Sequence, residues 1–84
     1  MKTKGRGLIG KIVVSEETGK KFGDVGDIRF ITESGELLHL VLNDPTEAAE
    51  SLRLEQDASG RLLIPFSTVK SVGDFVIISE KEIV

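Results

Sequence analysis

The sequence predicts a small all-β domain, an antiparallel β-barrel of about six short strands with one short helical segment. Nine glycines divide the 84 residues into short runs rich in Val, Ile, Leu and Phe, residues that favour strands. The chain has no cysteine and one histidine, which excludes disulfides and leaves no ligand set for zinc. So short a chain buries only about 60–65% of its unfolded surface. We therefore expect sheet closure and a partner subunit to supply stability.

The apolar runs define the expected strands in order. These are Leu8–Ser15, Asp24–Ile31, Glu36–Asn43, a short strand at 52–54, Arg61–Pro65 and Phe75–Ser79. Turns are expected at Gly19 and at 33–35, and Gly26 is expected to form a bulge or to allow a close approach of the backbone. Gly73-Asp74 predicts a hairpin turn, with Val69 and Val72 before it pointing inward.

The helical segment is expected between the third strand and the short strand. Asp44 is a capping residue, Pro45 suits the first helical position, and Glu47 stands where a capping box places its carboxylate. This arrangement predicts about two turns, ending at Glu50. A basic arm (1–7), a barrel (8–79) and a tail (80–84) complete the expected organisation.

The charge balance argues against a nucleic-acid-binding protein. The chain has 11 basic and 14 acidic residues, a net charge of −3 and a pI near 5.1. It lacks the positive surface of such proteins, and without Trp or Tyr it lacks their usual stacking side chains. No apolar run approaches the ~20 residues of a membrane span, and we expect no leader. The expected location is the cytoplasm.

Two groups of residues suggest chemistry only at first sight. Glycines 19, 23 and 26 match neither the dinucleotide fingerprint nor the phosphate-loop spacing, so turns and a bulge explain them better. Asp24 and Asp27 stand three apart on an expected strand, which would point them to opposite faces. Solvated surface charge is the simpler interpretation, so we expect no metal site.

His39 is the sole candidate base, and its neighbours Leu38 and Leu40 supply neither an orienting carboxylate nor a nucleophile. We expect a half-buried structural or interface histidine, no catalytic residue and no cofactor. The cluster Lys2, Lys4 and Arg6 could touch RNA or anionic lipid. Three charges are too few for stable anchoring at ~1 kcal/mol each, so a solvated arm is the plainer interpretation.

Several strands are apolar on both faces, which a lone antiparallel barrel does not require. We expect Leu62, Ile64, Phe66, Phe75 and Ile77 to fill the barrel, which leaves the alternate positions facing outward. Either the helical segment covers this outer face or a second chain does. The residues predicted to mediate self-association are Leu37, His39, Val41, Leu63, Val76 and Ile78.

The order of elements resembles the PRC-barrel domain, a family named for the photosynthetic reaction centre H subunit and shared with the ribosome-maturation factor RimM. The resemblance spans about residues 8–79. Its strongest motif is LIPF at 63–66 followed by VKSVGD at 69–74, supported by Gly10-Lys11 and by the Gly23-Asp24-Val25 run. It implies a small β-barrel docking module without catalytic residues. RimM has a second, N-terminal barrel domain and the reaction-centre subunit a membrane helix, and neither is present in this sequence.

The resemblance is greatest to short stand-alone archaeal members, some of which act as adaptors in FtsZ-based cell division. These contact the membrane anchor SepF and other PRC-barrel proteins, and they tend to self-associate. We therefore expect a cytoplasmic, homodimeric, non-enzymatic adaptor with partners of this kind, recruited to the division site. The alternative is an RNA-processing or ribosome-maturation factor that uses the basic arm, whose RNA binding would fall steeply with salt.

Two experiments follow from this expectation. Val41→Asp should dissociate the dimer, because an unpaired charge at a buried interface costs several kcal/mol. Burial of His39 should weaken assembly near pH 5–6, where imidazole becomes charged.

Overall fold

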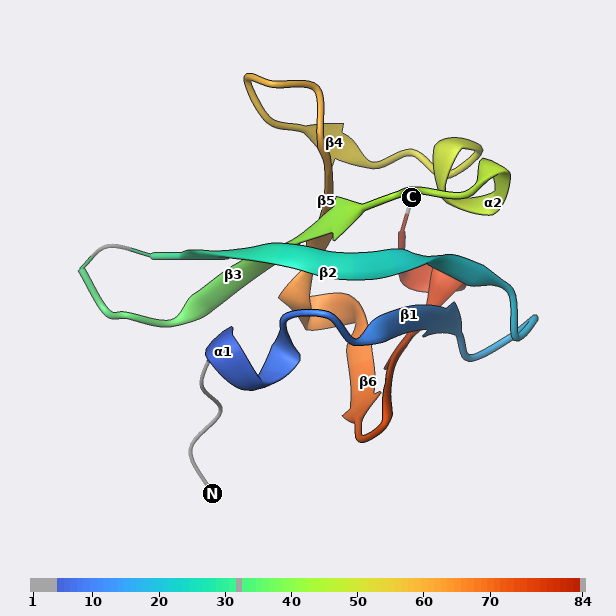
Figure 1. Cartoon of the computed structure of the whole chain (residues 1–84), viewed down its shortest axis with the longest axis horizontal. Helices are drawn as coiled ribbons and strands as arrows, with labels where there is room; N and C mark the ends of the chain where they lie inside the picture. The colour runs from blue at the N-terminus through green and yellow to red at the C-terminus, as the bar shows by residue number, and fades with distance from the viewer. Residues whose placement is uncertain (1–4, 32, 84) are drawn as a thin grey trace.

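The fold is that of a computed structural model, which describes residues 5–31 and 33–83 (Figure 1). Within these residues one seven-stranded sheet has the strand order β4-β5-β3-β2-β1-β7-β6. In chain order the elements are α1 (Gly5–Leu8), β1 (Ile12–Ser15), β2 (Lys21–Phe30), β3 (Leu37–Asn43), α2 (Glu47–Glu50), β4 (Glu55–Gln56), β5 (Leu62–Pro65), the 3-10 turn η1 (Phe66–Thr68), β6 (Val69–Val72), β7 (Phe75–Ile78) and the 3-10 turn η2 (Glu80–Glu82).

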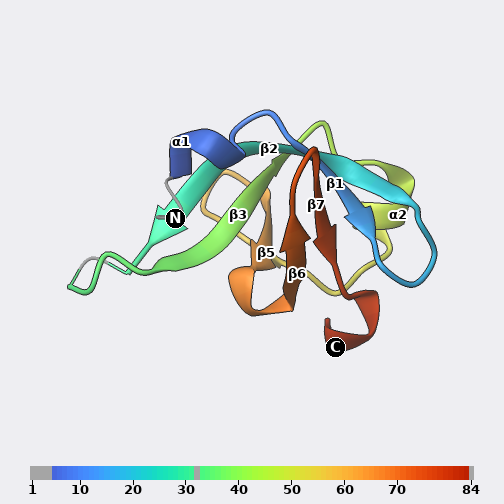
Figure 2. The ribbon, with the colours of Figure 1, turned by 90° about the horizontal axis from the view of Figure 1, so that it is seen from below.

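The sheet is barrel-like without closing, and the all-β prediction is confirmed. In Figure 1, β2 and β3 run across the view, whereas β5 and β6 run at a large angle to them. The sheet is therefore strongly curled. β4 and β6 remain as its two edges. All strand pairs but one are antiparallel; the exception is β1 with β7, which pair in parallel from Ile12–Phe75 to Ser15–Ile78. The first and the last strand of the chain therefore lie side by side, with β6 at the sheet edge beyond β7 (Figure 2).

The core lies on the inner face of the curled sheet and is closed by α1 and α2. Its buried members are Leu8, Val13, Phe22, Val25, Leu40, Leu42, Ala49, Leu62, Ile64, Val76 and Ile78. Leu8 ends α1 rather than starting a strand, and Ala49 of α2 is fully buried. Apolar residues from both ends of the chain thus share one core.

The face predicted for β7 was wrong. Val76 and Ile78, expected outside, are fully buried, whereas Phe75 is 48% exposed. The reason is the register with β1, which places Val76 opposite the buried Val13. When a four-residue strand is apolar on both faces, its alternation cannot identify the inner one.

Gly26 forms the predicted bulge, and this corrects another expectation. The register of β2 with β3 passes from Val25–Leu42 to Asp27–Val41, which leaves Gly26 unpaired. An ideal Cβ on Gly26 would lie 2.8 Å from the Cβ of Asn43, so a larger residue would not fit there. Because of the extra residue, Asp24 and Asp27 lie on the same, outer face of the sheet rather than on opposite faces.

The helical segment is a single turn, shorter than expected, and its cap differs. Thr46, not Asp44, is the N-cap: its hydroxyl oxygen accepts a hydrogen bond from the amide of Ala49 at 3.4 Å. The same hydroxyl donates to the carbonyl of Lys21 at 2.6 Å and so attaches the turn to β2. Asp44 has a positive φ of 51°, which a capping residue does not adopt. Glu47 therefore begins the helix instead of closing a capping box.

Several strand boundaries also shift. β1 begins at Ile12, and residues 52–54 form no strand, since β4 lies one residue further on. The turn at Gly73-Asp74 is confirmed between β6 and β7. Val72 was expected inside and is instead exposed near the end of this hairpin. None of the helices in the described residues is long and apolar enough to cross a membrane.

Candidate interaction surface

The outer face of the parallel pair carries four apolar side chains, Ile12 and Val14 from β1 and Phe75 and Ile77 from β7, here called the β1–β7 stripe. The register places Ile12 opposite Phe75 and Val14 opposite Ile77. Their sequence neighbours Val13, Val76 and Ile78 point into the core, so the four side chains share the outer face. Phe75 is 48% exposed and the other three are partly exposed. The stripe is thus an apolar surface on the described part of the chain.

Hydrogen bonds fix the parallel pair where the stripe ends. Glu17, just after β1, accepts hydrogen bonds from the hydroxyl of Ser79 at 2.7 Å and from the amide of Glu80 at 2.8 Å. The first of these, with help from the second, lowers the pKa of the Glu17 carboxyl. At the opposite end the Lys11 ammonium donates to the carbonyl of Gly73. These contacts hold β7 beside β1 and thereby keep the stripe together.

The outer face of β3 and β5, here called the β3–β5 face, carries the second apolar pair, Val41 opposite Leu63. Both are buried, at 1% and 5% exposure, although they point away from the core cluster. The register places Asp27 on one side of Val41 and Glu55 on the far side of Leu63. The apolar pair therefore lies between charged neighbours.

Arg61 makes ion pairs on this face of the sheet. Its guanidinium lies 2.8 Å from the carboxylate of Asp57 and 3.9 Å from that of Asp27. Asp27 belongs to β2 and Arg61 directly precedes β5, so the side chain must cross over β3 to reach it. The Arg61–Asp27 ion pair therefore spans β3 on the face that carries Val41.

His39 lies at the edge of this covered face. Its side chain is 16% exposed, and Nε2 is 3.5 Å from the carboxylate of Glu55. Nδ1 is buried and has no hydrogen-bond partner among the described residues. No serine or threonine hydroxyl in that part of the chain is hydrogen-bonded to the imidazole. The expected weakening of assembly at pH 5–6 stays a prediction.

The six residues predicted for self-association are not brought together as one exposed surface. Leu37 and His39 are partly buried, Val41 and Leu63 are buried between charged neighbours, and Val76 and Ile78 are in the core. Their role in self-association stays a prediction. The exposed large apolar residues of the described chain are instead Ile9, Phe30, Ile31, Leu38, Val72 and Phe75.

Sequence reasoning missed Phe75 because it chose the wrong face of β7. The signal that could have found it is non-local, since only the pairing of Val76 with Val13 decides the question. The exposed Phe30, Ile31 and Leu38 lie instead at the outer end of the β2–β3 hairpin, which projects from the body in Figures 1 and 2. Gly35, with a φ of +73°, turns this hairpin where the sequence predicted.

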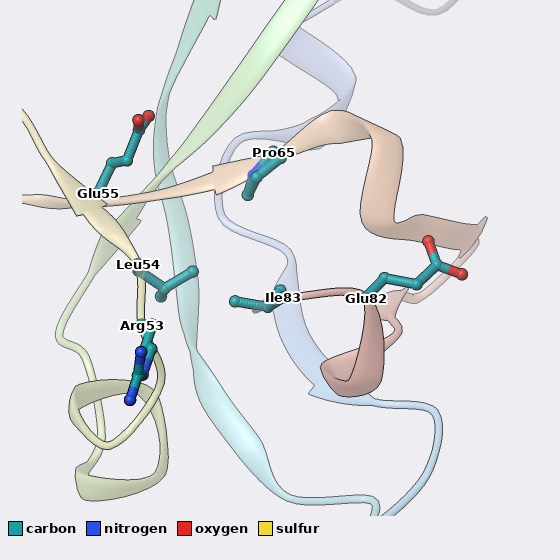
Figure 3. Close-up of a pocket in the computed structure, with 6 residues that line it drawn as sticks. All are labelled: Arg53, Leu54, Glu55, Pro65, Glu82 and Ile83. Carbon is teal, nitrogen blue, oxygen red and sulfur yellow. The ribbon is translucent and has the colours of Figure 1, made fainter.

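Two hollows lined by described residues are small, and neither brings together a reactive set of side chains. One, of about 250 Å³, lies between β4 and η2, where Leu54 and Ile83 point toward one another (Figure 3). Its other lining residues are Arg53, Glu55, Pro65 and Glu82. A second, of about 310 Å³, lies between α2 and β5. Across residues 5–31 and 33–83, no three His, Asp or Glu side chains gather as metal ligands would.

The basic arm and the end of the tail fall largely outside what the structure describes. Lys2, Lys4 and Val84 lie outside the described residues, and the side chain of Arg6 is not described either. Ile83 packs against the core cluster. The RNA-binding alternative, which depends on the arm, gains no geometric support from the described part of the chain.

Comparison with known proteins gives one assignment. The family model for the PRC-barrel domain matches residues 4–83. No curated protein matches the chain. The matched range covers nearly the whole chain, and the all-β, barrel-like sheet is consistent with it. The chain therefore belongs to the PRC-barrel domain family.

Proposed function

We propose that the chain is a non-enzymatic adaptor that self-associates and docks partner proteins through the outer face of its sheet. PRC-barrel domains are in general small β-barrel modules for protein interaction, and they are generally non-catalytic. The observation that carries the proposal is the β1–β7 stripe, an apolar outer surface with Phe75 about half exposed. An exposed apolar strip rimmed by polar residues is typical of a protein-binding surface.

The specific form of the proposal concerns cell division. The likeness of the sequence to short archaeal PRC-barrel adaptors supports a role in FtsZ-based division, in the cytoplasm, with SepF or another PRC-barrel division protein as partner. Such a partner would bring this small domain to the division site. No cofactor takes part in this mechanism, because docking needs only apolar contact and a polar rim that sets specificity.

A direct titration tests this role. Purified SepF from the same cell is added to the purified chain, and the heat of binding is measured by calorimetry. We expect saturable binding with a negative heat-capacity change, because apolar surface is buried. An unrelated acidic protein of similar size serves as the control and should release no such heat. Absence of binding by SepF and by the PRC-barrel proteins of that cell would contradict the division role.

A further inference from the structure

We propose that the β1–β7 stripe is covered by the same stripe of a second copy, with the strands of the two copies antiparallel. This deepens the self-association in the proposed function and rests on it. The two-fold axis would lie between the two sheets and run across their strands. The inference combines the exposure of the stripe with the charges along its edge.

The stripe lies on a parallel strand pair that is covered on one face only. Parallel strands are normally covered on both faces, because their connections place other elements there. In this chain the inner face of β1 and β7 is covered by the core, but Phe75 is 48% exposed on the outer face. All four side chains of the stripe are apolar and β-branched or aromatic, which suits packing of one sheet on another about 10 Å away.

Two charged residues of β2 lie beside the stripe. Asp24 lies opposite Ile12 and Lys21 lies opposite Val14, so one acidic and one basic residue flank the two ends of the stripe. Among the described residues neither takes part in an ion pair. The side-chain amide of Asn43 donates to the Asp24 carboxylate at 3.4 Å, which is a weak hydrogen bond. Both charges are therefore available to a partner.

The direction of the two-fold axis determines which side chains of the two copies face one another. A two-fold axis across the strands places β2 of one copy over β2 of the other with the ends exchanged. Lys21 of each copy then faces Asp24 of the other, which gives two reciprocal ion pairs. An axis along the strands would instead place the β2 edge over the β6 edge, where the residue opposite Ile77 is the uncharged Ser71. The charges thus favour the antiparallel arrangement.

The stripe offers only a small area for contact with a second copy. A standard stable interface takes about 800 Å² from each partner, which is about 15% of the 5440 Å² surface of this chain. Four partly buried side chains and their rim offer less than this. We therefore expect a dimer that forms at high protein concentration and dissociates on dilution, with ion pairs that make it sensitive to salt.

Charge exchange tests the arrangement by sedimentation equilibrium of the full chain. Lys21→Glu makes both ion pairs acidic–acidic, and Asp24→Lys makes both basic–basic, so each variant alone should dimerise about tenfold more weakly or worse. An equimolar mixture of the two variants pairs opposite charges again and should form heterodimers. The double variant Lys21→Glu with Asp24→Lys should recover the homodimer. Lys20→Glu, a neighbour in the adjoining turn with the same change of charge, should leave dimerisation unchanged.

The results distinguish the antiparallel arrangement from self-association in general. Far-ultraviolet circular dichroism first establishes that each variant is folded. A wild-type chain that stays monomeric at all concentrations would overturn both this inference and self-association, while SepF binding would still support docking. A wild-type dimer that neither charge variant weakens, or that the mixture does not restore, would overturn only the antiparallel arrangement.

Discussion

The β1–β7 stripe and the β3–β5 face have the same apolar sequence pattern but differ in how far their side chains are exposed. Both arise from strands that are apolar on each side, and both place apolar side chains on the outer face of the sheet. On the β3–β5 face Arg61 crosses over β3 to Asp27, and Val41 is 1% exposed. On the stripe no comparable cationic side chain is ion-paired across the strands in the described chain, and Phe75 stays 48% exposed. An apolar outer position is thus not by itself an interface.

The burial of Val41 changes the result that is expected for Val41→Asp. Val41→Asp was expected to break a dimer, but Val41 is already covered within one chain, beside the carboxylate of Asp27. A second carboxylate there would be buried and close to a like charge, so we expect the free energy of unfolding to fall by about 3 kcal/mol or more. Urea denaturation followed by circular dichroism measures this change. A fully stable Val41→Asp monomer would show that Val41 is accessible and that the face is open.

Phe75→Lys is the matching change on the stripe. Because Phe75 is half exposed, the folded monomer should tolerate it at a cost within about 1 kcal/mol. The dimer should weaken by at least about 30-fold, which corresponds to loss of an aromatic contact worth ~2 kcal/mol. Sedimentation equilibrium measures the dimer, and urea denaturation measures the monomer.

Leu38→Lys provides the control for this experiment. Leu38 is 42% exposed but lies on the projecting β2–β3 hairpin, away from the stripe. Its substitution should leave dimerisation unchanged. If Leu38→Lys weakened the dimer as much as Phe75→Lys, the hairpin and not the stripe would be the contact.

Removal of the cover should make the β3–β5 face resemble the stripe. Arg61→Ala leaves the carboxylates of Asp27 and Asp57 without their cation, and we expect it to expose Val41. Since Arg61 is itself half exposed, the loss of stability should be modest, about 1 kcal/mol. Binding of a dye that fluoresces on apolar surface should rise in the folded variant. Unchanged dye binding would mean that other side chains, and not Arg61, shield Val41.

The contrast between the two faces also shows how far sequence reasoning reaches in this molecule. Alternation and glycine placement predicted β3, β5, the bulge at Gly26 and the turn at Gly73-Asp74, because these depend on residues close in sequence. The pairing of β1 with β7 joins residues more than sixty positions apart, and it alone determines that Val76 is inside and Phe75 outside.

The candidate surface was less predictable than the fold. The reach of Arg61 over β3 depends on the strand order β5-β3-β2, which no local pattern contains. The capping error has a similar origin, because Thr46 is selected by its contact with the Lys21 carbonyl in β2, far away in the sequence. Local patterns in this chain predict elements, while long-range pairing decides which side chains remain exposed.

The smallest effect concerns the end of the stripe and is a stabilisation that is lost in acid. Hydrogen bonds from Ser79 and Glu80 lower the pKa of the Glu17 carboxyl below its ordinary value of 4.5, so the folded chain holds its proton less tightly than the unfolded chain. The resulting stabilisation is fully present above about pH 4.5 and is lost as the pH falls through the lower pKa of the folded state.

Glu17→Gln removes this dependence. The free energy of unfolding should fall less steeply below about pH 4.5 in the variant than in the wild type, and the two curves should converge on further acidification. Glu16→Gln, at an exposed position in the same turn, should keep the wild-type slope. Because Glu17 also fixes the end of β7 beside β1, Glu17→Gln should weaken dimerisation at neutral pH, whereas Asp57→Asn, which loosens the loop held by Arg61, should not. Equal effects of the two substitutions on the dimer would mean that the stripe and the β3–β5 face do not differ in the way their geometry indicates.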